Sequence, residues 1–357
     1  MHNFDYQILT KCLESRGKLQ QKLFELSKQE KENIFGNRVW FRGIIEFSNI
    51  CKNNCFYCGI RKDHKQKRFS MSLEEIMDSL EFIDQAHYGS VVYQSGEVTT
   101  DTFKDYLLEI VLMTHKKYPK LGITVSCGEQ DYTFLKKLKQ AGATRYLLRI
   151  ESSNKKLYEK LHPNEMSWDN RYLCLKNLQK LGYQVGTGVM VRLPGQTIDD
   201  LIQDLRFFID NKFDMFGIGP YVIHENTPLG EDLAIQKWWQ ENKDKNFNIF
   251  LNFLAILRVL LPNVNIAAAT ACDVFDPLGR IKVLQIAGNI IMPSVTPQDY
   301  RNLYLLYQGK PCIDEDADKC LNCITNKIVY AGLKPMFDEL GDSPFYYEKS
   351  KTTPPQK

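Results

Sequence analysis

Short apolar runs alternate along the chain with longer segments that have helical periodicity, from residue 38 almost to the end of the 357 residues. Apolar runs of roughly four to eight residues rich in β-branched and aromatic side chains are typical of buried strands, and apolar positions three or four apart are typical of amphipathic helices. On this basis we expect eight strands, at residues 39–47, 90–94, 123–127, 145–150, 184–191, 215–221, 265–269 and 289–292.

Helices are predicted between these strands. Ser72 is expected to cap the first of them, because Glu75 three residues later completes a capping box. Further helices are predicted at residues 103–117, 132–141, 169–181, 198–211, 236–260 and 280–287, and the polar segment 1–37 has helical spacing.

Strands that alternate with helices indicate parallel βαβ units, and eight repeats over about 250 residues match an α/β fold of the (β/α)8 TIM-barrel type. An open, doubly wound sheet alternates in the same way. The barrel is favoured because chemically informative residues follow successive strands: cysteines after the first, residues 94–97 after the second and Glu151 after the fourth. We therefore predict an N-terminal helical extension at 1–37, a barrel at 38–310 and a C-terminal segment at 311–357.

Composition narrows the class of protein. The chain has 46 Lys and Arg against 43 Asp and Glu, a net charge of +3 that gives no reason to expect a nucleic-acid partner. No apolar run reaches the roughly 20 residues of a membrane span, and the best candidate, 249–261, is interrupted by Asn252 and Arg258. The first five residues lack the apolar core of a signal peptide. We expect a cytoplasmic protein that binds no membrane.

Ten cysteines are the most informative feature of the composition. This content is far below the roughly 8–10% of a disulfide scaffold, and clustered cysteines in a reducing compartment indicate metal or redox chemistry. Four are expected to be ordinary thiols: Cys12, Cys127, Cys174 and Cys272. Six form two groups: Cys51, Cys55 and Cys58, and then Cys312, Cys320 and Cys323.

The first group, with C-x3-C-x2-C spacing, directly follows the first predicted strand. Thiolates suit zinc or iron–sulfur clusters, but a structural zinc site needs four ligands and only His64 lies nearby. The spacing resembles that of the radical S-adenosylmethionine (SAM) enzymes. The resemblance implies a [4Fe-4S] cluster with one open iron that binds SAM, and reductive cleavage of SAM to a 5′-deoxyadenosyl radical. A zinc loop or incidental thiols are the alternative.

Other segments resemble HydE-type maturases of [FeFe]-hydrogenase, which are related to biotin synthase and methylornithine synthase. The similar segments lie between about residues 37 and 335: 37–51, 93–97, 145–149, 193–200, 217–220, 291–293 and 300–304. The resemblance implies three sets of site residues. They are SAM contacts from Tyr57, Gln94, Ser126, Glu151 and Arg171, catalytic roles for Arg149, Thr270 and Tyr304, and substrate contacts from Met292 and Tyr307.

Arg149 also allows an inference that does not depend on the resemblance. An unpaired charge buried in a barrel strand is costly in free energy. Either an anionic substrate or a carboxylate partner would compensate it.

The second cysteine group resembles the auxiliary cluster site of some HydE proteins and implies a [2Fe-2S] or [4Fe-4S] cluster; taken alone it is equally a partial zinc site. The family further implies a substrate that is a mononuclear iron complex with cysteine, carbonyl and cyanide ligands. HydG would supply it, HydF would assemble the product, and a reducing electron donor would be needed. The adenosyl radical would add to the substrate sulfur.

The chain departs from the family pattern at Ile150, Arg192, Ala269 and Cys272, where His, Gly, Thr and Met are common. Arg192 is expected to bring a bulky charge near SAM. These changes leave room for a related mutase or synthase, of the methylornithine synthase or biotin synthase kind, acting on an amino acid or small carboxylate. A non-catalytic zinc-binding scaffold is the alternative from another class.

Overall fold

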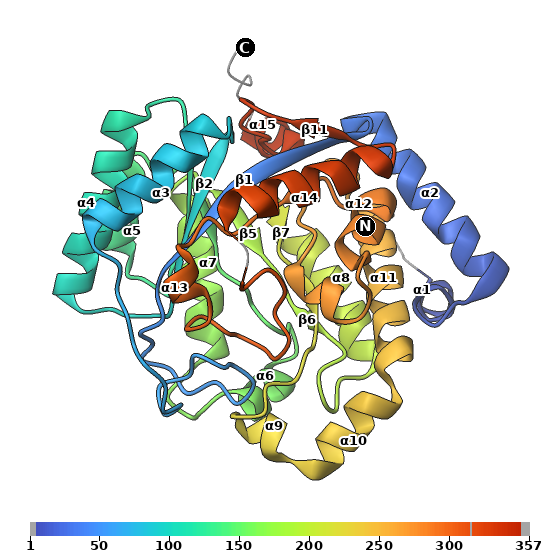
Figure 1. The fold of residues 1–357 in the computed structure, drawn as a ribbon. Helices are drawn as coiled ribbons and strands as arrows, with labels where there is room; N and C mark the ends of the chain where they lie inside the picture. Colours follow the sequence, from blue (N-terminus) through green and yellow to red (C-terminus); the bar gives the residue numbers. More distant parts are fainter. Residues whose placement is uncertain (1–4, 315, 351–357) are drawn as a thin grey trace.

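The computed structural model describes residues 5–314 and 316–350, and its centre is a ring of eight parallel strands (Figure 1). An isolated parallel bridge between Ala267 and Ile290 and a hydrogen bond from Ala268 N to Ile290 O (2.9 Å) join the last strand to β9 and close the ring. The predicted (β/α)8 barrel is confirmed. The ring contains β10 (Ile290–Ile291), β1 (Arg38–Ser48), β2 (Ser90–Ser95), β3 (Gly122–Ser126), β4 (Arg145–Leu147), β5 (Gln184–Thr187), β7 (Met215–Phe216) and β9 (Asn265–Ile266).

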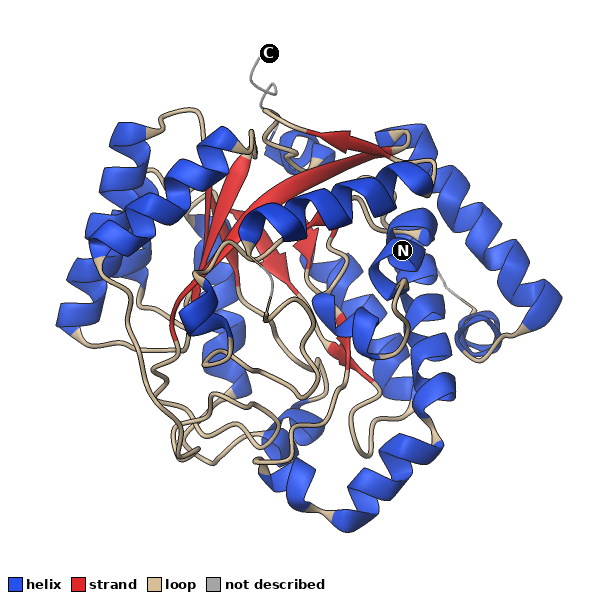
Figure 2. Cartoon of the chain, in the orientation of Figure 1, coloured by secondary structure: helices blue, strands red, loops and turns tan. Residues whose placement is uncertain are grey.

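Helices surround the ring on its outer face (Figure 2). Ser72 caps α3 in the predicted capping box with Glu75. The helices are α1 (Tyr6–Leu13), α2 (Gly17–Phe35), α3 (Leu73–Gln85), α4 (Asp101–Lys117), α5 (Tyr132–Gln140), α6 (Lys155–Leu161), α7 (Trp168–Lys180), α8 (Ile198–Asn211), α9 (Pro228–Glu231), α10 (Leu233–Glu241), α11 (Lys243–Leu260), α12 (Gly279–Ile286), α13 (Gln298–Arg301), α14 (Ala317–Tyr330) and α15 (Pro344–Ser350), with a 3-10 turn, η1 (Thr270–Val274).

Two predicted strands are each split. The segment 184–191 forms β5 and β6 (Met190–Val191), and the segment 215–221 forms β7 and β8 (Gly219–Pro220); β6 and β8 pair separately from the ring. The break comes where two backbones pass closely, since a Cβ on Gly188 would lie 2.1 Å from the Gly217 carbonyl oxygen. The close passage turns both strands out of the ring toward the loops.

One predicted helix is also divided. Residues 236–260 were expected to form a single helix, but α10 and α11 meet at Asn242. The Asn242 side chain donates to the Trp238 carbonyl at 2.8 Å. Asparagine side chains that bond to nearby backbone compete with helix continuation, which accounts for the break.

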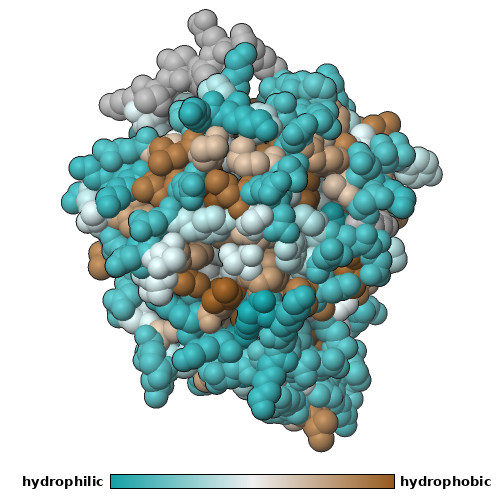
Figure 3. All heavy atoms as spheres, turned by 60° about the vertical axis from the view of Figure 1, so that its left-hand side comes forward, coloured by the Kyte–Doolittle hydropathy of each residue, from teal (hydrophilic) through white to brown (hydrophobic). Residues whose placement is uncertain are grey.

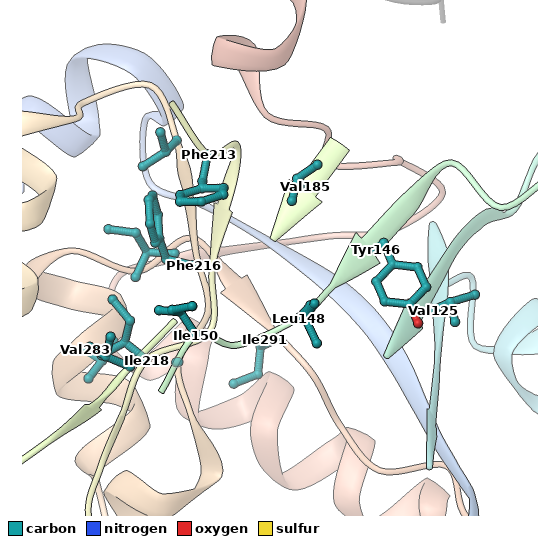
Figure 4. Packing of buried hydrophobic residues seen from close by; sticks show 14 of the residues in the cluster. Val125, Tyr146, Leu148, Ile150, Val185, Phe213, Phe216, Ile218, Val283 and Ile291 are labelled. Carbon is teal, nitrogen blue, oxygen red and sulfur yellow. The ribbon is translucent and has the colours of Figure 1, made fainter. Parts of the chain in front are cut away.

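Apolar side chains fill the barrel and the layer between strands and helices. Figure 4 shows part of this packing, with Val125, Tyr146, Ile150 and Ile218 among the labelled residues. All four are fully buried.

The end formed by the starts of the strands is covered by the C-terminal segment. In Figure 1 this segment, with β11 (Lys334–Met336) and α15, lies at the top, opposite the long loops. β11 pairs with the start of β1. Asp342 forms an ion pair with Arg145 at the start of β4, and the Gly341 carbonyl accepts from Arg42 Nη2 at 3.0 Å. The described part of 311–357 is thus packed on the barrel, while the division at 37 and 310 stays a prediction.

Among the helices formed by described residues, none combines the length and apolar character that a membrane span requires. On the face shown in Figure 3, polar side chains predominate and apolar side chains gather between them. The N-terminal helices α1 and α2 pack against α11.

Candidate active site

A cavity of about 340 Å³ opens at the carboxyl ends of the strands. Residues from loops after several strands line it together, as expected for a barrel whose loops converge on one face. Of the sixteen site residues predicted from the sequence, fifteen line this cavity and Cys323 does not. Those fifteen are Cys51, Cys55, Tyr57, Cys58, Gln94, Ser126, Arg149, Glu151, Arg171, Thr270, Met292, Tyr304, Tyr307, Cys312 and Cys320.

The loop that carries the first three cysteines is held from within by Arg68, which sequence reasoning missed. Its two terminal nitrogens donate to five backbone carbonyls of the segment 49–64, at 2.5 to 3.1 Å. Asn49 ties the start of the loop to the chain on either side, since its amide donates to the Lys67 and Leu303 carbonyls and its oxygen accepts from Phe69 N. The thiols therefore project from a fixed frame.

Two glycines allow neighbouring segments to pack on this loop. A Cβ on Gly96, after β2, would lie 2.2 Å from the Ile50 carbonyl oxygen. A Cβ on Gly59 would lie 2.0 Å from the Leu305 carbonyl oxygen. Because both obstacles are backbone atoms, a side chain at either position would push the loop away from the cavity wall.

Burial sets the acid–base state of the three thiols. It raises the pKa of Cys51 and Cys55 and raises that of Cys58 to about 12. Buried thiols of this kind stay protonated until a metal displaces the proton. Among residues 5–314 and 316–350, no group of three or more His, Cys, Asp or Glu side chains converges closely enough to hold a single metal ion.

Arg171 is the centre of a buried charge network. Its Nε donates to Glu129 Oε1 at 2.8 Å, its Nη2 donates to Glu97 Oε2 at 3.1 Å, and its Nη1 donates to the Arg149 carbonyl. Lys52 lies 3.3 Å from the other oxygen of Glu97, whose backbone N–H points at Cys51 Sγ. Arg171 thus joins the loops after β2, β3 and β4 directly behind the cysteine loop.

Arg149 and Glu151 face each other at the end of β4. Arg149 Nη2 lies 3.0 Å from Glu151 Oε2, so Glu151 is the carboxylate partner that a charge at this position requires. The angle between the groups is poor, and these two atoms and Arg149 Nε make no well-directed hydrogen bond to any described residue. Glu151 also has a φ of 64°, in the left-handed region. Strained residues with unsatisfied polar atoms cluster at ligand sites.

Tyr57 is fixed by a histidine that the sequence analysis did not single out. The Tyr57 hydroxyl lies 3.0 Å from His162 Nε2, and His162 Nδ1 lies 2.7 Å from the Tyr158 carbonyl. The carbonyl can only accept, so Nδ1 carries the proton and Nε2 accepts from Tyr57. Burial lowers the pKa of His162 to about 3, which keeps this ring neutral.

A second ion pair, between Glu46 and Lys310, lies in the cavity wall. Lys310 Nζ is 2.6 Å from Glu46 Oε1 and also donates to the Tyr304 carbonyl at 3.1 Å. The signal for Glu46 was present in the sequence, because it is a lone carboxylate inside an apolar strand. Nothing in the sequence pairs it with a lysine 264 positions away.

The second cysteine group lines an adjoining cavity of about 280 Å³. Cys312, Cys320 and Cys323 all border it, and the first two also border the main cavity. Arg280 points at Cys312 Sγ from 3.8 Å and is paired with Asp273 through Nε at 2.6 Å. Arg280 thus places a cation beside Cys312, and a nearby cation favours the ionised form of a thiol and hence metal binding.

The expectation that Arg192 brings its charge to the SAM side is not met: Arg192 does not border the main cavity. Its side chain donates to Asn246 Oδ1 at 3.0 Å and lies over the Trp238 ring. Its φ of 67° is a conformation that glycine adopts without strain. Ile150 and Cys272 are fully buried, whereas Ala269 borders the cavity.

The residues present fit an iron–sulfur cluster and SAM. Three thiols on one fixed loop are suitable donors, and the poorly satisfied polar atoms of Arg149 and Glu151 face the same space. A polynuclear cluster takes thiolates spread around it and does not need them to converge on one ion.

Comparison with known proteins agrees with this geometry. Residues 45–208 match the family model described as "Radical SAM superfamily". The [FeFe] hydrogenase maturase subunit HydE of Thermotoga maritima is 42% identical over 316 residues, which is 88% of this chain and 86% of that protein. The 3-methylornithine synthase of Methanosarcina acetivorans is 28% identical, over 90% of this chain and 87% of that protein.

Solved structures share the fold. A crystal structure of methylornithine synthase (PylB) superposes with a TM-score of 0.79 at 24% identity and covers 93% of this chain and 94% of that one. The family relationship implies a [4Fe-4S] cluster and SAM, and it makes the chain an enzyme rather than a zinc-binding scaffold. The chain belongs to the HydE family of [FeFe]-hydrogenase maturases, within the radical SAM superfamily.

Proposed function

We propose that this enzyme is a HydE-type maturase that uses SAM to act on an iron complex during assembly of the [FeFe]-hydrogenase cofactor. The observation that carries the proposal is the single cavity shared by Cys51, Cys55 and Cys58 and the Arg149–Glu151 pair. It joins a three-thiol loop to polar groups that lack well-directed partners. The 42% identity to HydE favours this function over the synthase related at 28%.

Each residue of the site has a physical role in this proposal. The three thiols would hold the cluster, and Tyr57, held by His162, would pack on the adenine. Arg149 and Glu151 would offer a donor and an acceptor to the polar groups of SAM, while Gln94 and Ser126 would contribute from the ends of β2 and β3. When bound, the cluster and SAM supply a 5′-deoxyadenosyl radical.

Arg171 would act differently from the role that the resemblance implied. Three of its N–H groups already bond to Glu129, Glu97 and the Arg149 carbonyl. We infer that it positions the loops around SAM and that direct contact with the SAM carboxylate falls to Arg149. Thr270, Met292, Tyr304 and Tyr307 would enclose the substrate and keep water from it.

The substrate proposed is a mononuclear iron complex with cysteine, carbonyl and cyanide ligands, and the adenosyl group would add to its sulfur. HydG would supply it, HydF would receive the product, and a separate donor would supply the electron. We also propose that Cys312, Cys320 and Cys323 hold an auxiliary [2Fe-2S] or [4Fe-4S] cluster beside Arg280. A cytoplasmic location suits all of these components.

The test is anaerobic reconstitution with iron and sulfide, reduction with dithionite, and measurement of 5′-deoxyadenosine after addition of SAM. Replacing Cys51, Cys55 and Cys58 by Ser should abolish the product, whereas the control Cys12→Ser, on α1 and outside the cavity lining, should keep it. Adding the HydG product should then give an adenosylated compound. A protein that cleaves SAM but leaves the iron complex unchanged would contradict the maturase function.

A further inference from the structure

The Glu46–Lys310 ion pair is a charged feature of the main cavity that the proposed reaction does not use. The side chains of Glu46 and Lys310 are 5% and 11% exposed. Glu46 extends from β1, and Lys310 extends from the segment between α13 and α14 that leads to Cys312. Removing two charges from water is costly, so a buried pair at a ligand cavity calls for an explanation beyond stability.

Both members of the pair have a hydrogen-bonding position to spare. Glu46 Oε1 accepts from Lys310, but the other oxygen, Oε2, is buried and has no hydrogen-bond partner among the described residues. Lys310 has three N–H groups, of which one points at Glu46 Oε1 and one at the Tyr304 carbonyl. A free acceptor and a free donor therefore lie side by side in one wall of the cavity.

The ion pair between Lys349 and Asp214 shows the contrast. It has a similar separation, 2.8 Å, and a buried carboxylate, but it does not border the cavity. Val185 N donates to Asp214 Oδ2, whereas Asp214 Oδ1, which faces Lys349, makes no well-directed hydrogen bond to a described residue. An open carboxylate oxygen therefore also occurs in a pair away from the cavity, and the Glu46–Lys310 pair differs in that both of its members border the cavity.

The two free hydrogen-bonding positions, on Glu46 and Lys310, determine which chemical groups a ligand must present to them. An acceptor that carries negative charge takes an ammonium group, and a donor that carries positive charge takes a carboxylate. Charge-assisted hydrogen bonds are roughly twice as strong as neutral ones, so charged groups are favoured over an amide of the same shape. A group that carries both charges leaves the net charge of the wall unchanged.

We propose that Glu46 and Lys310 form a binding site for the α-ammonium and α-carboxylate groups of an amino-acid portion of the substrate. Glu46 Oε2 accepts from the ammonium, and the third N–H of Lys310 donates to the carboxylate. The site rests on the proposed function, because it places this portion of the substrate in the same cavity as the cysteine loop and SAM.

The test uses cluster-loaded, SAM-bound protein without reductant, so that the SAM site is filled and no turnover occurs. The probes are L-serine, ethanolamine, which lacks the carboxylate, and 3-hydroxypropionate, which lacks the ammonium. Affinity is measured by saturation-transfer NMR titration. L-serine should bind, and each truncated probe should bind about tenfold more weakly or worse, as expected when one charge-assisted hydrogen bond is lost.

Variants assign the site to the pair. Glu46→Gln and Lys310→Met should each weaken L-serine binding by about tenfold or more, and Lys310→Arg, which keeps the charge, should stay within about threefold of wild type. Lys349→Met, which breaks the comparison pair, should leave the affinity unchanged. A thermal unfolding scan of each variant confirms that the protein being titrated is folded.

The proposal is overturned if wild type does not bind L-serine up to about 50 mM, if the three probes bind equally, or if Glu46→Gln and Lys310→Met leave the affinity unchanged. Formation of 5′-deoxyadenosine by reduced wild type is measured separately. A lack of 5′-deoxyadenosine counts against the proposed function, whereas the serine titration tests the Glu46–Lys310 site by itself.

Discussion

Replacing Arg171 by Met should destabilise the fold strongly, because it leaves the partly buried carboxylate of Glu129 without its ion-pair partner and the buried carboxylate of Glu97 with only Lys52. The Glu97 and Glu129 side chains are 7% and 21% exposed, and Arg171 contacts both. Breaking a buried ion pair by removal of one partner costs about 3–5 kcal/mol. With a urea slope of about 3 kcal/mol per M, this lowers the unfolding midpoint by about 1 to 1.7 M.

The loss of stability in Arg171→Met should become smaller as the pH falls. Burial raises the pKa of Glu129, and Arg171 opposes that rise. Without Arg171 the pKa of Glu129 rises further, so the folded variant takes up a proton that the unfolded chain does not. Lowering the pH from 7.5 to 5.5 should therefore stabilise Arg171→Met more than wild type and narrow the difference between them.

The assay is urea unfolding of the cluster-free protein under anaerobic, reducing conditions, followed by far-UV circular dichroism. Lys237→Met is the matched control, since Lys237 and Glu241 form an exposed pair on α10. It should cost less than about 1 kcal/mol. A loss below about 1 kcal/mol for Arg171→Met, or a difference that widens at pH 5.5, would refute the charge-compensation reasoning.

Three further predictions concern the surroundings of the site. Arg68→Met removes five hydrogen bonds to the cysteine loop, so iron retained per chain after reconstitution and desalting should fall by more than half; equal iron content in variant and wild type would contradict this. His162→Phe removes the acceptor for the Tyr57 hydroxyl. SAM affinity, measured by calorimetry, should fall roughly fivefold, which corresponds to a loss of about 1 kcal/mol of binding free energy. An unchanged affinity would show that Tyr57 does not need this hydrogen bond. Burial raises the pKa of Asp204 to about 7, so the folded protein binds this proton more tightly than the unfolded chain and wild type should lose stability as pH rises from 5 toward 7. Asp204→Asn should flatten that dependence in urea unfolding, and a slope equal to that of wild type would count against the assignment.

The sequence predicted the barrel well because its signals are local. Apolar runs of strand length and a cap such as Ser72 depend on residues within a few positions of each other, and the structure places a strand at each of the eight predicted runs. The split of two strands at Gly188 and Gly217 was missed, since it arises where separate backbones pass each other.

For the site, as for the fold, local signals in the sequence were predictive and long-range contacts were missed. The spacing of Cys51, Cys55 and Cys58 indicated the chemistry because the three lie on one loop. The resemblance gave Arg171 a ligand role, while the structure surrounds its guanidinium with carboxylates from two other loops. The partner of Glu46 lies 264 positions away. Pairings of this kind depend on how the chain returns to the barrel, which no local pattern encodes.

The C-terminal segment has a consequence for biosynthesis. Arg42 lies in the first half of β1 and Arg145 at the start of β4, and each bonds to a group at position 341 or 342. Burial lowers the pKa of Arg42 to about 9, which shows how unfavourable its charge is there. A nascent chain still attached at these positions has two buried cations without their partners. The barrel, and the frame it gives the cysteine loop, is therefore complete only once residues 341 and 342 have been synthesised and have packed against Arg42 and Arg145.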